Sequence, residues 1–71
     1  MRFAVIGPES QVRGYELAGV LVLVAEDPDT ARALWRDLPS DVAIVILAPL
    51  AAEALRDDAL TAGSPLTAVL P

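Results

Sequence analysis

The chain has 71 residues, 55% of them hydrophobic, with a formal net charge of −5 and a pI near 4.2. This length fits one domain over residues 1–71 with one thin core, since a domain of this size buries only about 60% of its unfolded surface. The acidic balance argues against binding to nucleic acid or to an anionic membrane surface. Because the sequence has neither cysteine nor histidine, it excludes disulfides, thiolate nucleophiles and the usual zinc sites.

The longest apolar stretches are Ala18–Ala25 and Val42–Ala52, and the second contains Pro49. Both are shorter than the roughly 20 residues of a membrane-spanning helix. The apolar segment at the amino terminus is also too short for a signal peptide. We therefore expect a cytoplasmic protein with no segment inserted in a membrane.

Four apolar runs rich in Val, Ile and Leu predict β-strands. They are Phe3–Ile6, Val20–Ala25, Val42–Leu47 and Leu66–Leu70. None of them alternates regularly between apolar and polar residues. Continuous apolar runs of this length are typical of strands covered on both faces, as in parallel sheets with helices on each side.

The three segments between these runs predict helices. The first is expected to open at Pro8, with Gly14 allowing a close approach to the sheet. In the second, Asp27 is expected to be the N-cap and Pro28 the first helical residue. The third is expected to run from about Pro49 to Leu60, followed by Gly63 as its C′ residue.

The resulting order of elements is β-α-β-α-β-α-β. Right-handed crossovers then predict a doubly wound α/β fold with a four-stranded parallel sheet of order 2-1-3-4, as in flavodoxin and receiver domains. The first helix is expected on one face of the sheet and the other two on the opposite face. The first face would then remain uncovered over the third and fourth strands.

In such a sheet, ligands bind beyond the carboxyl ends of the strands, at the crevice between strands one and three. Here that crevice would hold a single carboxylate and neither a base nor a nucleophile beside it. Its lining residues would be Gly7, Pro8, Glu9, Ala48 and Pro49. We therefore predict no catalytic residues, no cofactor and no bound nucleotide. A receiver domain is excluded too, because the acidic pair, the phospho-accepting Asp and the Lys of receivers are all missing.

A hard-cation site could be imagined at the acidic cluster of Glu26, Asp27 and Asp29. The cluster lacks the ligand spacing of a calcium loop, and a capped helix start accounts for its residues. We therefore predict no metal site.

One heptad resembles the small globular subunit of the central stalk of V/A-type rotary ATPases. It is Gly14-Tyr15-Glu16-Leu17-Ala18-Gly19-Val20, which is similar to that family's Gly-aromatic-x-Leu-Ala-Gly-apolar ending of the first helix. The strand and helix of Asp41–Leu60 and the strand that closes at Pro71 follow the family's pattern as well. Members of the family continue into a C-terminal helical segment, and we expect this chain to correspond to their globular core without that segment.

The resemblance implies a non-catalytic rotor subunit on the cytoplasmic side of a membrane-bound ATPase. Its partner would be the long coiled-coil subunit of the rotor, and its role would be to help couple ATP hydrolysis or synthesis to ion transport, including hydrogen ion transport. We expect the contact to involve the first helix and the sheet beside it. The candidate interface residues are Arg13, Tyr15 and Glu16.

Two other interpretations stay open. The chain could be a stand-alone or degenerate receiver-like α/β module that binds a protein or forms a homodimer through its uncovered face. Alternatively, it could be a small hydrolase dependent on the Glu9 carboxylate, although the sequence supplies no matching base.

Overall fold

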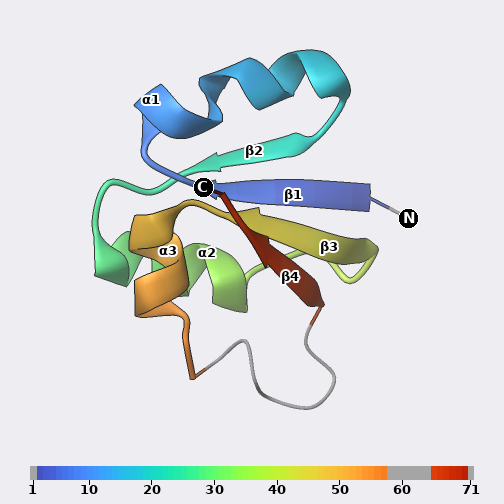
Figure 1. Ribbon diagram of the computed structural model, residues 1–71. Helices are drawn as coiled ribbons and strands as arrows, with labels where there is room; N and C mark the ends of the chain where they lie inside the picture. Colours follow the sequence, from blue (N-terminus) through green and yellow to red (C-terminus); the bar gives the residue numbers. More distant parts are fainter. Residues whose placement is uncertain (1, 58–64, 71) are drawn as a thin grey trace.

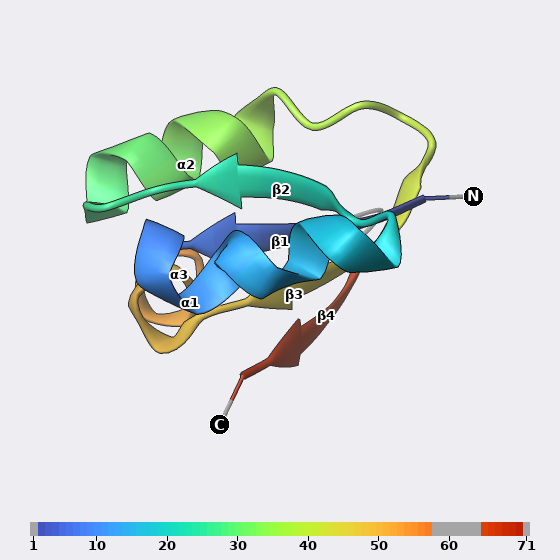
Figure 2. The same ribbon diagram turned by 90° about the horizontal axis from the view of Figure 1, so that it is seen from above.

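A computed structural model describes residues 2–57 and 65–70 of the chain. Its centre is a four-stranded parallel sheet of order β2-β1-β3-β4, with helices on both faces (Figures 1 and 2). The elements are β1 (Arg2–Gly7), α1 (Glu9–Val12), the 3-10 helix η1 (Arg13–Ala18), β2 (Leu21–Val24), α2 (Pro28–Arg36), β3 (Val42–Leu47), α3 (Pro49–Ala54) and β4 (Leu66–Val69). The predicted fold class and strand order are confirmed.

The first helix differs from the prediction in form. Only four residues are α-helical, and the segment then tightens into the six-residue 3-10 helix η1. Pro8 is the extended N-cap residue of α1 rather than its first helical residue. Gly14, a poor helix former, lies at the start of η1. A side chain there would meet nothing within 4 Å, so the expected close approach of Gly14 to the sheet is wrong.

The second helix begins as predicted. Asp27 is the N-cap residue, its carboxylate accepts a hydrogen bond from the Thr30 N–H at 2.7 Å, and Pro28 follows at the first helical position. This bond satisfies one of the backbone donors that a helix start leaves free. It also lowers the pKa of the Asp27 carboxyl, because the hydrogen bonds from Thr30 favour its charged form.

This cap gives the stability of the fold a defined pH dependence. Since the pKa of Asp27 is lower in the folded chain, its contribution is complete above the unfolded value of 3.8 and is lost as the pH falls through the folded pKa. Asparagine caps as well as aspartate but does not titrate in this range. We therefore expect Asp27→Asn to show a shallower loss of thermal stability than the parent between pH 5 and 2 (a range chosen to bracket the carboxyl titration).

Unfolding followed by circular dichroism across this range checks the expectation, with Asp29→Asn as the matched control. Asp29 lies in the first turn of the same helix but is not its N-cap residue. Equal pH profiles for Asp27→Asn and the parent would contradict the role of the cap.

The third helix is shorter than predicted. It begins at Pro49 as expected but ends at Ala54, and a turn follows through Asp57. Leu60 and Gly63, the predicted end and C′ residue, lie outside the described residues. The strands differ only at their ends, since β2 is confined to four of the six predicted residues and β4 ends one residue early.

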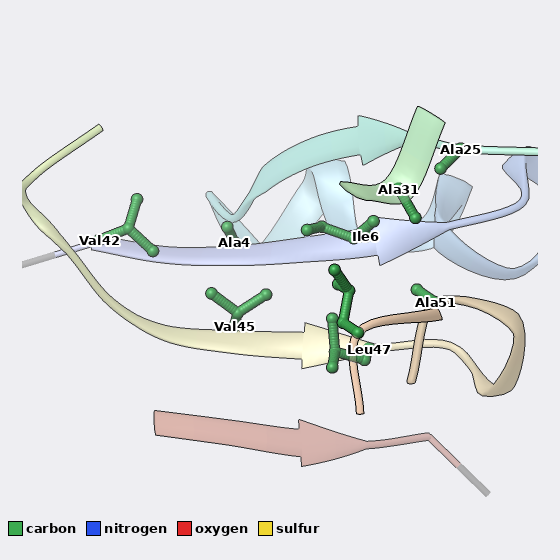
Figure 3. Close-up of a cluster of buried hydrophobic side chains, with 9 residues drawn as sticks. Ala4, Ile6, Ala25, Ala31, Val42, Val45, Leu47 and Ala51 are labelled. Carbon is green, nitrogen blue, oxygen red and sulfur yellow. The ribbon is translucent and has the colours of Figure 1, made fainter. Parts of the chain in front are cut away.

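The main core lies between the sheet and the helices α2 and α3, which cover one of its two faces. Side chains of β1 and β3 meet small residues of both helices there (Figure 3). The buried members are Ala4, Ile6, Ala25, Ala31, Val42, Val45, Leu47, Ala51 and Leu55. Leu34 and Trp35 of α2, and Leu38 just after it, pack against this cluster while partly exposed.

A smaller buried contact and an ion pair also hold the sheet in place. On the other face of the sheet, α1 contributes Val12, which is fully buried, as is Val5 of β1. At the amino end, the Arg2 guanidinium donates to both Asp41 carboxylate oxygens, at 2.7 and 3.1 Å, which joins the start of β1 to the residue before β3. In the part of the chain that the structure describes, no helix has the length and hydrophobicity needed to cross a bilayer.

Candidate protein-binding surfaces

The crevice at the carboxyl ends of β1 and β3 is packed with side chains. A Cβ on Gly7 would collide with the Cβ of Ala48 and lie 3.3 Å from a methyl group of Val12. Gly7, Val12 and Ala48 are all buried. The place where α/β proteins of this topology commonly hold a ligand is therefore occupied by the chain's own residues.

The start of α1, next to this crevice, is held by a carboxylate. The Glu9 N–H donates to Oε2 of Glu26 at 3.2 Å. A negative side chain thus lies where a phosphate would bind in a nucleotide-binding protein of similar topology. An anionic ligand would have to displace Glu26 and would also meet the carboxylate of Glu9.

The acidic residues near the carboxyl ends do not form a metal centre in the described part of the chain. No group of three His, Cys, Asp or Glu side chains among residues 2–57 and 65–70 could hold a metal ion. The Asp27 carboxylate is used by the helix cap, and the Asp29 carboxylate accepts from the Arg32 guanidinium at 2.9 Å.

The sheet face that carries α1 is only half covered. Register pairing places Phe3, Ile44 and Leu66 side by side across three strands. A second row continues from Val5 through Ile46 to Ala68, and all these side chains share one face because side chains alternate along strands. We call Phe3, Ile44, Ile46, Leu66 and Ala68 the open face.

On this face of the sheet, exposure is high at Phe3 and Leu66 and lower at Ile44 and Ile46, which are half-buried. Val5 is fully buried, Phe3 is 42% exposed and Leu66, on the edge strand, is 73% exposed. The helices α1 and η1 contact β1 and β2, and Figure 2 shows β4 clear of them. Among the described residues, the uncovered region over the third and fourth strands is therefore where the sequence predicted it.

The candidate interface residues on η1 lie at a different place. Arg13 and Glu16 line a groove of about 110 Å³ between α1, η1 and the edge strand β2, together with Glu9, Val12, Val22 and Val24. The Arg13 guanidinium is 3.4 Å from the Glu9 carboxylate. Tyr15 is half-buried on η1. The structure thus places two of the three predicted residues together, on the β2 side of the helix rather than on the open face.

A second hollow, of about 350 Å³, lies at the amino end of the sheet. It is lined by Trp35, Leu38, Pro39, Ser40, Val42 and Pro65. None of these six residues carries a charge, and Ser40 supplies the one side-chain hydroxyl. The hollow can receive an apolar group but offers no reactive group.

The sequence predicted which strands would be uncovered, because no helix follows the fourth apolar run. It did not predict which side chains of those strands would point to the uncovered side. Comparison with known proteins adds no identification, because no family model and no curated protein matches this sequence. The resemblance to the small central-stalk subunit stays a prediction.

Proposed function

We propose that this chain is a non-catalytic binding subunit that docks one helix of a coiled coil on its open face. The observation that carries the proposal is the exposure of Phe3 and Leu66, at 42% and 73%, on the sheet face that α1 covers only in part. Contiguous exposed apolar side chains on a small protein are typical of interaction sites. One partner helix packed against these side chains would remove them from water.

The size of the uncovered region supports a helix as the partner. The open face extends from Phe3 on β1 across β3 to Leu66 on β4, and neighbouring strands lie about 4.8 Å apart, so this face is about 10 Å wide. Packed helices lie about 8–10 Å apart, and one more helix beside α1 would therefore fill this face. A partner helix with apolar side chains at i, i+3, i+4 and i+7 matches a surface made of Phe, Ile, Leu and Ala.

The resemblance of the Gly14–Val20 heptad to the small central-stalk subunit specifies this partner further. On that basis, the coiled coil is the long rotor subunit of a V/A-type ATPase, and the chain helps couple ATP hydrolysis or synthesis to ion transport from the cytoplasmic side of the complex. The packed crevice at the carboxyl ends of the strands is compatible with a role in which other subunits carry out the chemistry.

Mixing the chain with the coiled-coil rotor protein from the same source tests this proposal. Light scattering after size-exclusion chromatography should report a one-to-one complex, and Leu66→Glu should weaken it at least tenfold. Val69→Glu is the matched control, because Val69 lies on the same strand, is 59% exposed and pairs with Leu47, whose side chain lies on the opposite face.

Equal effects of the two glutamate substitutions would contradict docking on the open face. A persistent homodimer that ignores the coiled coil would favour the stand-alone module instead. A triple substitution of Arg13, Tyr15 and Glu16 by alanine separates the two surfaces. If it weakens the complex and Leu66→Glu does not, the coiled coil contacts η1 and not the open face.

A further inference from the structure

The groove beside β2 differs from the open face in carrying both backbone and charged groups. The sheet ends at β2, whose outer edge pairs with no other described strand. The Ala25 N–H donates to the Gly7 carbonyl at 2.8 Å, so alternate residues of this strand direct their backbone groups toward β1. The N–H and C=O groups of Val22 and Val24 therefore point outward, away from the sheet.

The side chains above this edge form an apolar floor with a negative rim. Val12 is buried, Val22 is half-buried and Val24 is 43% exposed. The rim has the carboxylates of Glu9 and Glu16, and Glu26 is hydrogen-bonded to the backbone of Glu9. These three exposed carboxylates stand against one guanidinium, that of Arg13, which already lies 3.4 Å from Glu9.

We propose that this groove binds an extended basic segment of another protein by strand addition to β2. The backbone of the segment would pair with the outward N–H and C=O groups of Val22 and Val24, as edge strands do when they receive a peptide. Arginine side chains on the segment would lie along the valine floor and reach the rim carboxylates with their guanidinium groups.

Charge decides between this partner and a second copy of the chain. Two copies paired edge to edge through β2 would bring their rim carboxylates together on molecules that each carry a net charge of −5. Like charges that face each other across an interface oppose association. A basic segment meets the same rim with opposite charge. This inference is independent of the coiled coil, because its residues are separate from the open face.

The probe is the peptide acetyl-Val-Arg-Val-Arg-Val-amide, with acetyl-Val-Glu-Val-Glu-Val-amide as its charge-reversed counterpart. Titration into the isotope-labelled chain should shift the amide resonances of β2, and the acidic peptide should not. The bound peptide should slow hydrogen exchange at the Val22 and Val24 amides at least tenfold. The Leu23 amide faces β1 and should change little.

Paired charge reversals test the rim. Glu16→Arg combined with Glu26→Arg should weaken the basic peptide at least tenfold, whereas Asp37→Arg, at the exposed end of α2, should leave its affinity unchanged. Circular dichroism of each variant checks that the fold is retained. Absence of binding, equal loss in the Asp37 control, or binding without protection of Val22 and Val24 would each overturn the inference. Leu66→Glu should leave this site intact, so failure here and failure of the coiled-coil proposal are distinguishable.

Discussion

Replacement of Leu55 by alanine is expected to remove a large part of the fold's stability. Leu55 follows α3, is fully buried and belongs to the main core cluster. A leucine truncated to alanine in a core costs about 2–5 kcal/mol, because transfer free energy is lost and a cavity remains. Natural domains have about 0.05–0.15 kcal/mol of stability per residue. For a chain of this length the loss is therefore comparable with the whole free energy of unfolding.

The matched control is the same substitution on the open face. Leu66 is 73% exposed, so Leu66→Ala removes little buried surface and should change the unfolding free energy by less than about 0.5 kcal/mol. Urea unfolding of both variants, followed by circular dichroism, measures the difference. Comparable losses at the two positions would mean that Leu66 is covered by the chain's own residues, which would also remove the basis of the proposed docking face.

Periodicity and topology rules predicted most of this fold because its signals are strong and local. Four β-branched runs separated by proline and glycine specified the strands, and right-handed crossovers then left the observed strand order as the expected one. The cap at Asp27 was predictable for the same reason, since the Asp-Pro pair specifies a helix start by chemistry alone. The ends of α3 and the 3-10 form of η1 depend on tertiary packing, which no local pattern states.

Surfaces were harder to predict than elements. The uncovered strands followed from counting helices, but only the strand register shows that Phe3 and Leu66 flank Ile44 in one row. Arg13 and Glu16 were chosen from a motif, and their position beside β2 depends on how the first helix is rotated on the sheet. A shift of register by one residue would have turned the opposite set of side chains to the open side.

One added methyl group at Gly7 is expected to destabilise the fold strongly. Its Cβ would overlap the Cβ of Ala48 and press on Val12. The Ala48 Cβ is attached directly to the backbone between β3 and α3, so relief requires movement of a strand rather than rotation of a side chain. Overpacking of this kind costs about 1–3 kcal/mol. We therefore expect Gly7→Ala to destabilise the fold by that amount in urea unfolding.

Two further variants make this expectation specific. Gly14→Ala adds the same methyl group where nothing lies within 4 Å, and it should be neutral or stabilising because alanine restricts the unfolded chain.

Ala48→Gly in the Gly7→Ala background removes the opposing Cβ at a helix N-cap, where glycine is preferred to alanine. The double variant should therefore recover most of the lost stability, with a coupling energy of about 0.5–3 kcal/mol. Additive effects at Gly7 and Ala48 would mean that the two backbones do not meet in the crevice. The crevice between β1 and β3 would then have room for a ligand, and this result would contradict the non-catalytic role proposed for the chain.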